Sequence, residues 1–175
     1  SAIANQLKSD YEVIAFDKEK CRFAGGTGVK TADSITVLCD QSQAVIIAVK
    51  PQDFDAVLDE IKGYKHLLDK LFISIAAGIT TEYIQKRLGV VRVVRAMPNI
   101  GARIGSSVTC ISQGASATDE DMDFTLDLFE YIGEVKQIDE GMMDAATAVS
   151  GSGPGYFFYL LQARGIDMKN TPAVN

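Results

Sequence analysis

The feature that most constrains the fold is the segment at residues 44–49, which is apolar at every position. Lys50 and Pro51 end this run. A strand with one face in water alternates apolar and polar residues, whereas a strand covered on both faces is a continuous apolar run. The segment therefore predicts an inner strand of a parallel sheet that is covered on both sides.

Strands and helices alternate on either side of this segment. The expected strands are residues 13–16, 29–30, 44–49, 71–76 and 90–94, and the expected helices are residues 1–7, 18–24, 33–40, 53–61 and 80–88. One of these helices carries an apolar stripe made of Phe54, Val57, Leu58 and Ile61. The alternation predicts an α/β fold, a Rossmann-like doubly wound parallel sheet in which 13–16, 44–49, 71–76 and 90–94 are mutually parallel.

The pattern changes after Asn99. Strands are expected at 108–111 and 134–138, with a helix between them that starts at Thr118 and Asp121 in the manner of a capping box. From residue 141 to 163 the sequence is typical of one helix after another, broken at 150–155. This switch predicts a domain boundary near Asp139, which divides the chain into residues 1–138 and 139–175.

Composition excludes several classes of protein. The chain has 175 residues, 47% of them apolar and 23% charged, which is normal for a globular protein. Its net charge of −6 argues against a nucleic-acid partner, and no apolar run is long enough to cross a membrane. Three scattered cysteines and a single histidine, His66, favour neither a disulfide framework nor a metal site. We expect a cytoplasmic protein without a metal.

A dinucleotide-binding fold begins with a strand and a Gly-x-Gly-x-x-Gly turn, and the sequence contains no such turn. The glycine cluster at residues 25–28 is interpreted as a helix stop rather than a phosphate-binding loop. Residues 1–7 nevertheless look like the helix that should follow the turn. We therefore expect that the sequence is incomplete at its start, and that the central strand it lacks leaves unpaired strand edges.

Two short motifs carry the strongest functional signal: residues 93–99 (VVRAMPN) and residues 149–154 (VSGSGP). Together, and behind a train of β/α units, they resemble the motifs of the pyrroline-5-carboxylate reductase family. The resemblance covers residues 1 to about 163. Residues 164–175 do not match the family, and its Gly/Thr-rich substrate turn has no counterpart, so we expect incompleteness at this end also.

The resemblance implies that residues 1–138 bind a dinucleotide and that residues 139–175 begin an all-helical substrate and dimerisation domain. It implies the last step of proline biosynthesis, the reduction of 1-pyrroline-5-carboxylate to L-proline by hydride transfer from NAD(P)H. The partners would be the small-molecule substrate and further copies of the chain, in a homodimer or higher homo-oligomer. Residues 156–161, apolar or aromatic all round, are expected at or near that interface.

Candidate cofactor-binding residues follow the expected strands, because ligands of open α/β sheets bind at the carboxyl ends of the strands. Lys50, Ala77 and Asn99 are expected to converge on one cleft there. Asp17 favours NAD, but Lys18 could accept the 2′-phosphate of NADP, so both cofactors stay open. Each of these segments could also be an ordinary strand end. The cofactor-binding residues are Asp17, Lys18, Ala48, Val49, Lys50, Pro51, Ala77, Met97, Pro98 and Asn99.

The candidate substrate-binding residues combine Asn99 with the start of the last helix, where free backbone N–H groups suit an anion such as a carboxylate. They are Asn99, Ser150, Gly151, Ser152 and Gly153. A helix break with a capping serine is the simpler interpretation of 150–153 and is compatible with this one. The family continues after Asn99 with Thr-Pro-Ala, whereas this chain has Ile100, Gly101 and Ala102, which puts substrate fit in question.

No catalytic proton donor can be assigned from the sequence. A protonated imine is already electrophilic, so hydride transfer needs mainly alignment and exclusion of water. Two alternatives remain. One is a non-catalytic, dinucleotide-binding regulatory relative of the family, which the Ile100-Gly101 departure favours slightly. The other is a dehydrogenase of similar architecture acting on another small imine or hydroxy acid.

Overall fold

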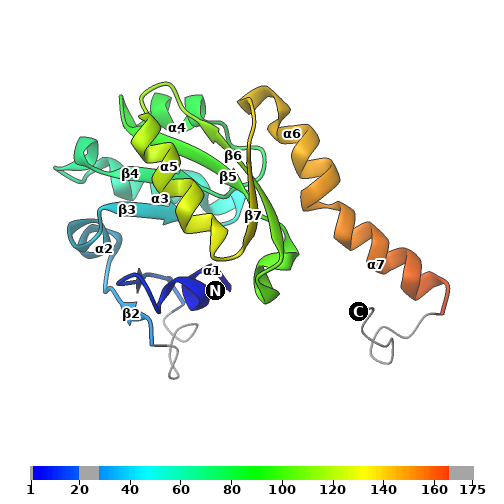
Figure 1. The fold of residues 1–175 in the computed structure, drawn as a ribbon. Coiled ribbons are helices and arrows are strands. Elements are labelled where there is room, and N and C mark those ends of the chain that lie inside the picture. Colours follow the sequence, from blue (N-terminus) through cyan, green and yellow to red (C-terminus); the bar gives the residue numbers. More distant parts are fainter. Residues whose placement is uncertain (1, 20–27, 166–175) are drawn as a thin grey trace.

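The computed structural model describes residues 2–19 and 28–165 (Figure 1). Its strands are Ile14–Ala15 (β1), Lys30–Thr31 (β2), Ala44–Ile47 (β3), Leu71–Ser74 (β4), Arg92–Met97 (β5), Ser107–Gln113 (β6) and Gly133–Gln137 (β7). Its α-helices are Ala2–Leu7 (α1), Ile35–Gln41 (α2), Pro51–Lys62 (α3), Thr81–Leu88 (α4), Asp119–Glu130 (α5), Met143–Ala146 (α6) and Gly153–Ala163 (α7). Tighter or wider helical turns are Leu67–Asp69 (η2), Ile100–Ile104 (η3), Glu140–Met142 (η4) and the π-helical Thr147–Gly151 (η5).

The main sheet has the order β3-β4-β5-β6-β7, and β3, β4 and β5 run parallel. This confirms the predicted direction of the segments 44–49, 71–76 and 90–94. The segment 13–16 is different, because β1 pairs only with β2, in a separate two-stranded parallel sheet. The prediction of one sheet is therefore wrong for this segment. No strand of the described residues belongs to both sheets.

The sheet is also not parallel throughout, since β6 runs antiparallel to β5. A parallel crossover needs a dozen or more residues. Only residues 98–106 join β5 to β6, so the chain has to turn straight back. The last strand, β7, follows the α5 crossover and runs in the same direction as β6, with which it pairs.

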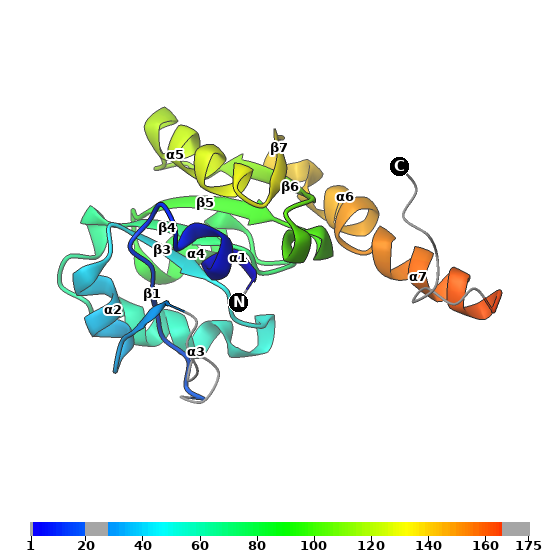
Figure 2. The same cartoon turned by 60° about the horizontal axis from the view of Figure 1, so that its bottom comes forward.

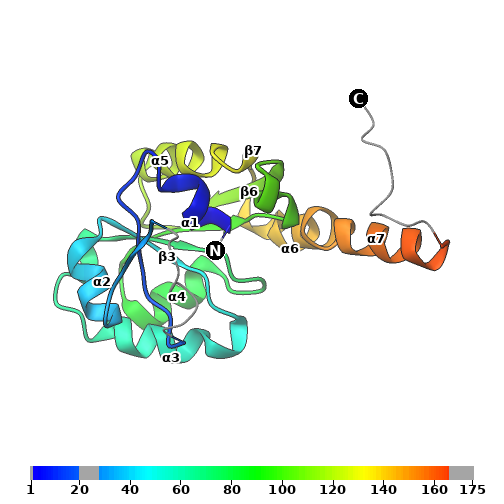
Figure 3. The same cartoon turned by 90° about the horizontal axis from the view of Figure 1, so that it is seen from below.

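Two apolar clusters, one on each face of the sheet, hold the layers together. The first packs α2, α3 and α4 against the sheet and includes Phe54, Leu58, Phe72, Ile84 and Val93. The second packs α1 and α5 against the other face and includes Leu7, Ile73, Val94, Leu128 and Phe129. Figure 3 shows α1 and α5 on one side of the sheet and α2, α3 and α4 on the other. The doubly wound α/β architecture is thus as predicted.

The helix starts follow local chemistry. The hydroxyl of Thr80 accepts a hydrogen bond from the N–H of Tyr83, and Ser34 caps α2 in the same way. At α5, Thr118 and Asp121 form the expected capping box, each side chain accepting from the other's backbone N–H. The expected helix 18–24 falls mostly on residues outside the described ranges. The expected helix 141–149 is instead divided into η4, α6 and η5.

Beyond β7, α6 packs against the sheet, where Met143 is fully buried, and α7 then forms an arm that projects away from the layered part of the structure (Figures 1 and 2). The aromatic and aliphatic side chains of α7 are exposed over most of its circumference, at Tyr156, Phe157, Phe158, Tyr159 and Leu160. Within the described ranges, no helix combines the length and apolar character that crossing a bilayer requires. The apolar surface of α7 is large for a helix that faces only water.

A test of the core uses Phe72, which is fully buried at the centre of β4. Phe72→Ala should lower the free energy of unfolding by about 3–5 kcal/mol, because it leaves a cavity between the sheet and its helices. The control is Val90→Ala, at a side chain 77% exposed, which should change stability by less than about 0.5 kcal/mol. Chemical denaturation measures both. A Phe72→Ala loss as small as that of the control would contradict the assigned core.

Candidate functional site

The candidate site lies at the carboxyl edge of β3, β4 and β5. These strands are neighbours and parallel, so their last residues share one edge of the sheet. Lys50, Ala77 and Asn99 follow the three strand ends within a few residues. The three residues therefore share one sheet edge, as predicted. The cleft that they would line stays a prediction.

Small residues keep the turn after β4 open. Ala77 is exposed, and the next residue, Gly78, has a φ of +75°, which favours glycine. A Cβ atom built on Gly78 would meet no other atom within 4 Å. The space beside this turn is therefore not filled by other described parts of the chain.

The segment after β3 leads directly into α3. Ala48 and Lys50 are exposed, Val49 is half-buried, and Pro51 is the first residue of the helix. Lys50 precedes the helix without a side-chain capping bond. The hydrogen bond from Lys18 lowers the pKa of Asp53, and the charge of the Lys50 ammonium group adds to this effect. The exposed position of Lys50 at the strand end leaves it accessible to a ligand.

Asn99 is held from three sides. Its backbone N–H donates to the hydroxyl of Ser107 at 3.1 Å, and its side-chain oxygen accepts from the N–H of Gly101 at 3.0 Å. Its side-chain Nδ2 donates to the hydroxyl of Ser150 at 3.4 Å. Because the N–H of Gly101 binds the amide oxygen of Asn99, the NH₂ group of Asn99 is the part that faces Ser150.

The two sequence motifs meet here, although they are far apart in the chain. Besides its contact with Asn99, the Ser150 hydroxyl donates to the carbonyl oxygen of Val108 at 3.3 Å. Next to it, a Cβ atom on Gly151 would come within 3.0 Å of the Met97 methyl group, so the backbone packs closely on that side chain. Gly151 therefore allows a contact between the η5 turn and the end of β5.

The remaining predicted residues of this region lie at the start of α7 and at the end of β5. Ser152 precedes α7 and makes no side-chain capping bond, and Gly153 is the first residue of that helix. The N–H of Ser152 donates to the Thr147 oxygen at 2.9 Å, within η5. The N–H of Gly153 belongs to the first turn of α7, where intrahelical partners are lacking. Pro98 is half-buried between Met97 and Asn99.

Asp17 and Lys18 follow β1 in the smaller sheet. Lys18 Nζ lies 2.8 Å from Asp53 Oδ1 in the first turn of α3, close in sequence to Lys50 and Pro51. The pair lowers the pKa of Asp53 and raises that of Lys18, mainly through this hydrogen bond. An Asp17 side-chain oxygen accepts the backbone N–H of Glu19 at 2.9 Å. Lys18 thus already has an anionic partner on the neighbouring segment.

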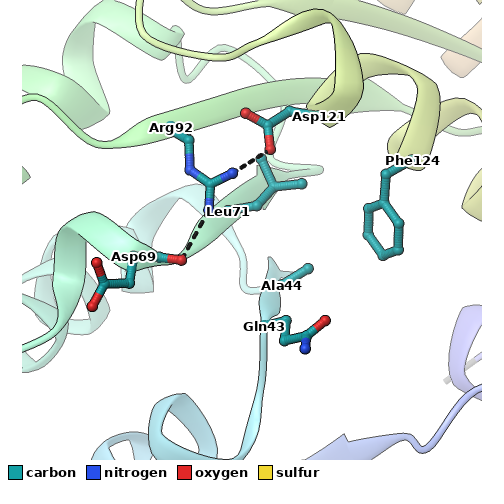
Figure 4. Close-up of a pocket in the computed structure, with 7 residues that line it drawn as sticks. All are labelled: Gln43, Ala44, Asp69, Leu71, Arg92, Asp121 and Phe124. Carbon is teal, nitrogen blue, oxygen red and sulfur yellow. Dashed lines mark hydrogen bonds and ion pairs between the residues drawn. The ribbon is translucent and has the colours of Figure 1, made fainter.

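A hollow of about 370 Å³ lies at the opposite edge of the sheet (Figure 4). It is lined by the first residues of β3, β4 and β5, which are Ala44, Leu71 and Arg92. In this hollow Arg92 donates to the Asp121 carboxylate at 2.7 Å and to the backbone oxygen of Asp69 at 2.8 Å. Ligands of open α/β sheets bind at the other end of the strands, so we assign this hollow no role in the site.

Sequence reasoning missed a buried polar cluster around Arg95, which lies four residues before Asn99 in the chain. Arg95, on β5, has a side chain only 3% exposed and lies near Glu140 and Asp144. Thr81, at the start of α4, is also buried and donates to Glu140. One signal could have found Arg95: it is a charged residue with apolar neighbours on both sides in its strand. Its partners come from distant segments and carry no such signal.

The structure also accounts for the departure from the family pattern after Asn99. A Cβ atom on Gly101 would lie 2.2 Å from the carbonyl oxygen of Ser106, far inside contact distance. The N–H of Gly101 is needed for the bond to Asn99, and a proline in that place has no N–H to donate. The η3 turn of this chain therefore depends on glycine at 101.

Comparisons with known proteins agree with this architecture. Residues 1–78 match the family described as NADP oxidoreductase coenzyme F420-dependent. The pyrroline-5-carboxylate reductase of Mycobacterium leprae is 34% identical over 165 residues, which are 91% of this chain and 56% of that protein. The 1-pyrroline-5-carboxylate reductase structure from Streptococcus pyogenes superposes with a TM-score of 0.84 at 30% identity, over 98% of this chain and 67% of the other. The Plasmodium falciparum pyrroline carboxylate reductase, solved with NADP bound, gives 0.83 at 26% identity, over 93% and 62%.

The fold is thus that of a Rossmann-like oxidoreductase domain joined to the first helices that follow it. On the strength of these relatives, the chain belongs to the pyrroline-5-carboxylate reductase family, as the two motifs predicted. The chain spans about half the length of the curated relatives it matches.

The η3 turn provides a test of the site's framework. Gly101→Ala should lower the free energy of unfolding by about 1–3 kcal/mol, because the added methyl group overlaps the Ser106 carbonyl. The matched control is Gly141→Ala, where a Cβ atom would meet nothing within 4 Å. That variant should be neutral or more stable by about 0.4–1 kcal/mol. Equal effects in chemical denaturation would show that the close approach at 101 is not real.

Proposed function

We propose that the whole protein reduces 1-pyrroline-5-carboxylate to L-proline with NADPH or NADH, and that this chain supplies its cofactor-binding domain and part of its substrate site. The observation that carries the proposal is the contact between the two motifs. Asn99, at the end of β5, meets Ser150, at the start of the helical arm, on the sheet edge where α/β proteins bind ligands. The names of the curated relatives agree with this reaction.

The residues at the strand ends fit a nicotinamide dinucleotide. The open turn at Ala77 and Gly78 and the exposed Ala48 leave room for flat rings, and Lys50 can meet a ribose hydroxyl or a phosphate. The remaining proposed cofactor contacts are Asp17, Lys18, Val49, Pro51, Met97, Pro98 and Asn99. Once bound, the cofactor supplies the hydride. Asp17 suits the ribose hydroxyls of NADH and Lys18, although paired with Asp53, is a cation that can meet the 2′-phosphate of NADPH, so the proposal covers both cofactors.

The proposed substrate contacts are Asn99 and residues 150–153. The NH₂ group of Asn99 and the hydroxyl of Ser150 are directed polar groups that can orient the imine. The N–H of Gly153, in the first turn of α7, suits the substrate carboxylate, because a helix N-terminus attracts anions. The N–H of Ser152 is already bonded to the Thr147 oxygen. The work of this chain's residues is to bind, to align and to exclude water; none is assigned as a proton donor.

We further propose that the chain divides near Asp139 into a cofactor domain, 1–138, and the beginning of a helical substrate and dimerisation domain. The exposed apolar surface of α7, which includes Tyr156 and Phe157, supports a homodimer or a larger homo-oligomer. A reducing cytoplasm fits the thiols of Cys39 and Cys110, which are buried and unpaired. Burial raises the pKa of both thiols and so keeps them unreactive.

The experiment is an assay of the full-length protein with pyrroline-5-carboxylate and each reduced cofactor, following oxidation of the nicotinamide. Asn99→Ala should lower kcat/KM for the imine by about tenfold or more, because a directed hydrogen bond to the substrate is lost. Val90→Ala, at an exposed position before the amino end of β5 and so at the sheet edge away from the site, should behave like the natural protein.

Absence of turnover with both cofactors, in a folded protein that still binds NADPH, would overturn the reductase proposal. It would favour the non-catalytic regulatory relative instead. Turnover that Asn99→Ala leaves unchanged would remove Asn99 from the substrate site while keeping the reaction.

A further inference from the structure

The buried charge of Arg95 needs compensation, since an unpaired guanidinium in a protein interior is very costly. Its partners lie on a distant part of the chain. Arg95 Nη1 is 3.7 Å from Glu140 Oε1, and Nη2 donates to Asp144 Oδ1 at 3.3 Å. The Asp144 side chain is 84% exposed, so water screens it, and Glu140 is the more sheltered partner.

The Glu140 carboxylate also binds the start of α4. Its Oε1 accepts the backbone N–H of Thr81 at 2.7 Å, and its Oε2 accepts the Thr81 hydroxyl at 2.6 Å. Both are charge-assisted hydrogen bonds, and the positive end of the α4 dipole adds to them. One carboxylate thus ties together β5, the first turn of α4 and the η4 turn.

These three elements each carry one part of the candidate site. Thr81 follows the open turn at Ala77 and Gly78, and Arg95 precedes Asn99 on the same strand end. Glu140 begins the helical run that continues through α6 to residues 150–153. A shift of Glu140 would therefore move the substrate segment relative to both strand-end segments.

We propose that Glu140 is a positioning residue, which holds residues 150–153 at the distance from Asn99 and Ala77 that hydride transfer requires. This inference rests on the proposed reductase function. It assigns Glu140 no contact with substrate or cofactor; it acts through Arg95 and Thr81. A misplacement of about 1 Å between reacting groups can lower a rate by about a hundredfold, so such a residue has a measurable effect.

The chain provides a matched control on the same strand. Arg92, at the amino end of β5, pairs with the buried Asp121 carboxylate at 2.7 Å, on the sheet edge away from the site. Asp121→Asn removes the charge of a carboxylate that is more buried than that of Glu140, and it should cost stability without moving the site. Glu140→Gln keeps the size of the side chain but removes its charge. Thr81→Val removes one of the two bonds to Glu140 and serves if Glu140→Gln does not fold.

The first measurement is steady-state kinetics of the full-length variants below their unfolding transitions. For Glu140→Gln we expect kcat to fall by about tenfold and the KM for the imine to rise by about tenfold, because the imine loses its alignment. The KM for the reduced cofactor should change by less than about threefold, since the sheet still holds the strand ends. Thr81→Val should change the same parameters less, and Asp121→Asn should change none of them.

The second measurement is amide hydrogen exchange of the ligand-free proteins, which does not depend on activity. Peptides covering residues 147–163 should exchange faster in Glu140→Gln than in the natural protein, and not faster in Asp121→Asn. If the natural protein shows no turnover, the proposed function fails while this measurement still tests the positioning role. Unchanged exchange, or kinetic losses equal to those of Asp121→Asn, would overturn the proposal.

Discussion

The parallel pairing of β3, β4 and β5 is the constraint on which the other features depend. The strands are apolar on both faces, so helices have to cover the sheet on both sides. Because the strands are parallel, their carboxyl ends lie at one edge of the sheet. Apolar strands alone could slide past one another without exposing polar groups. Arg95 prevents this in β5, where it lies opposite Ser74 in the register. A shifted strand would carry its charge away from Glu140, so the buried ion pair helps to specify the register.

The reversal of the chain after β5 both sets the direction of β6 and holds Asn99 in place. The short connection forces β6 to run antiparallel, and the η3 turn that makes this possible needs glycine at 101. The same turn supplies the N–H that orients the Asn99 amide, while Ser107 at the start of β6 holds the Asn99 backbone. The residues that differ from the family pattern thus help to hold Asn99 in this chain.

Local signals in the sequence were sufficient for most elements. The apolar run at 44–49, the stripe around Phe54 and the Thr118 capping box each depend on residues close together in the chain, and each appears where it was predicted. Features that depend on distant residues were missed. The pairing of β1 with β2 alone, the Arg95–Glu140 ion pair and the π-helical form of η5 all arise from packing between segments. Asn99 and Ser150 were linked only through a family resemblance.

The η5 turn explains how one arm can serve both the site and an assembly. Its wide helical ring, closed by the bond from the Ser152 N–H to the Thr147 oxygen at 2.9 Å, interrupts the helix where Ser150 and Gly151 contact the sheet domain. π-helical turns of this kind occur often at functional sites. The base of the arm is thus anchored, while α7 beyond it presents apolar side chains to water. In the proposed homo-oligomer, a partner that covers α7 would restrain the helix whose N-cap and first residue, 152 and 153, are proposed to contact the substrate. Assembly and substrate alignment then act on one element from opposite ends.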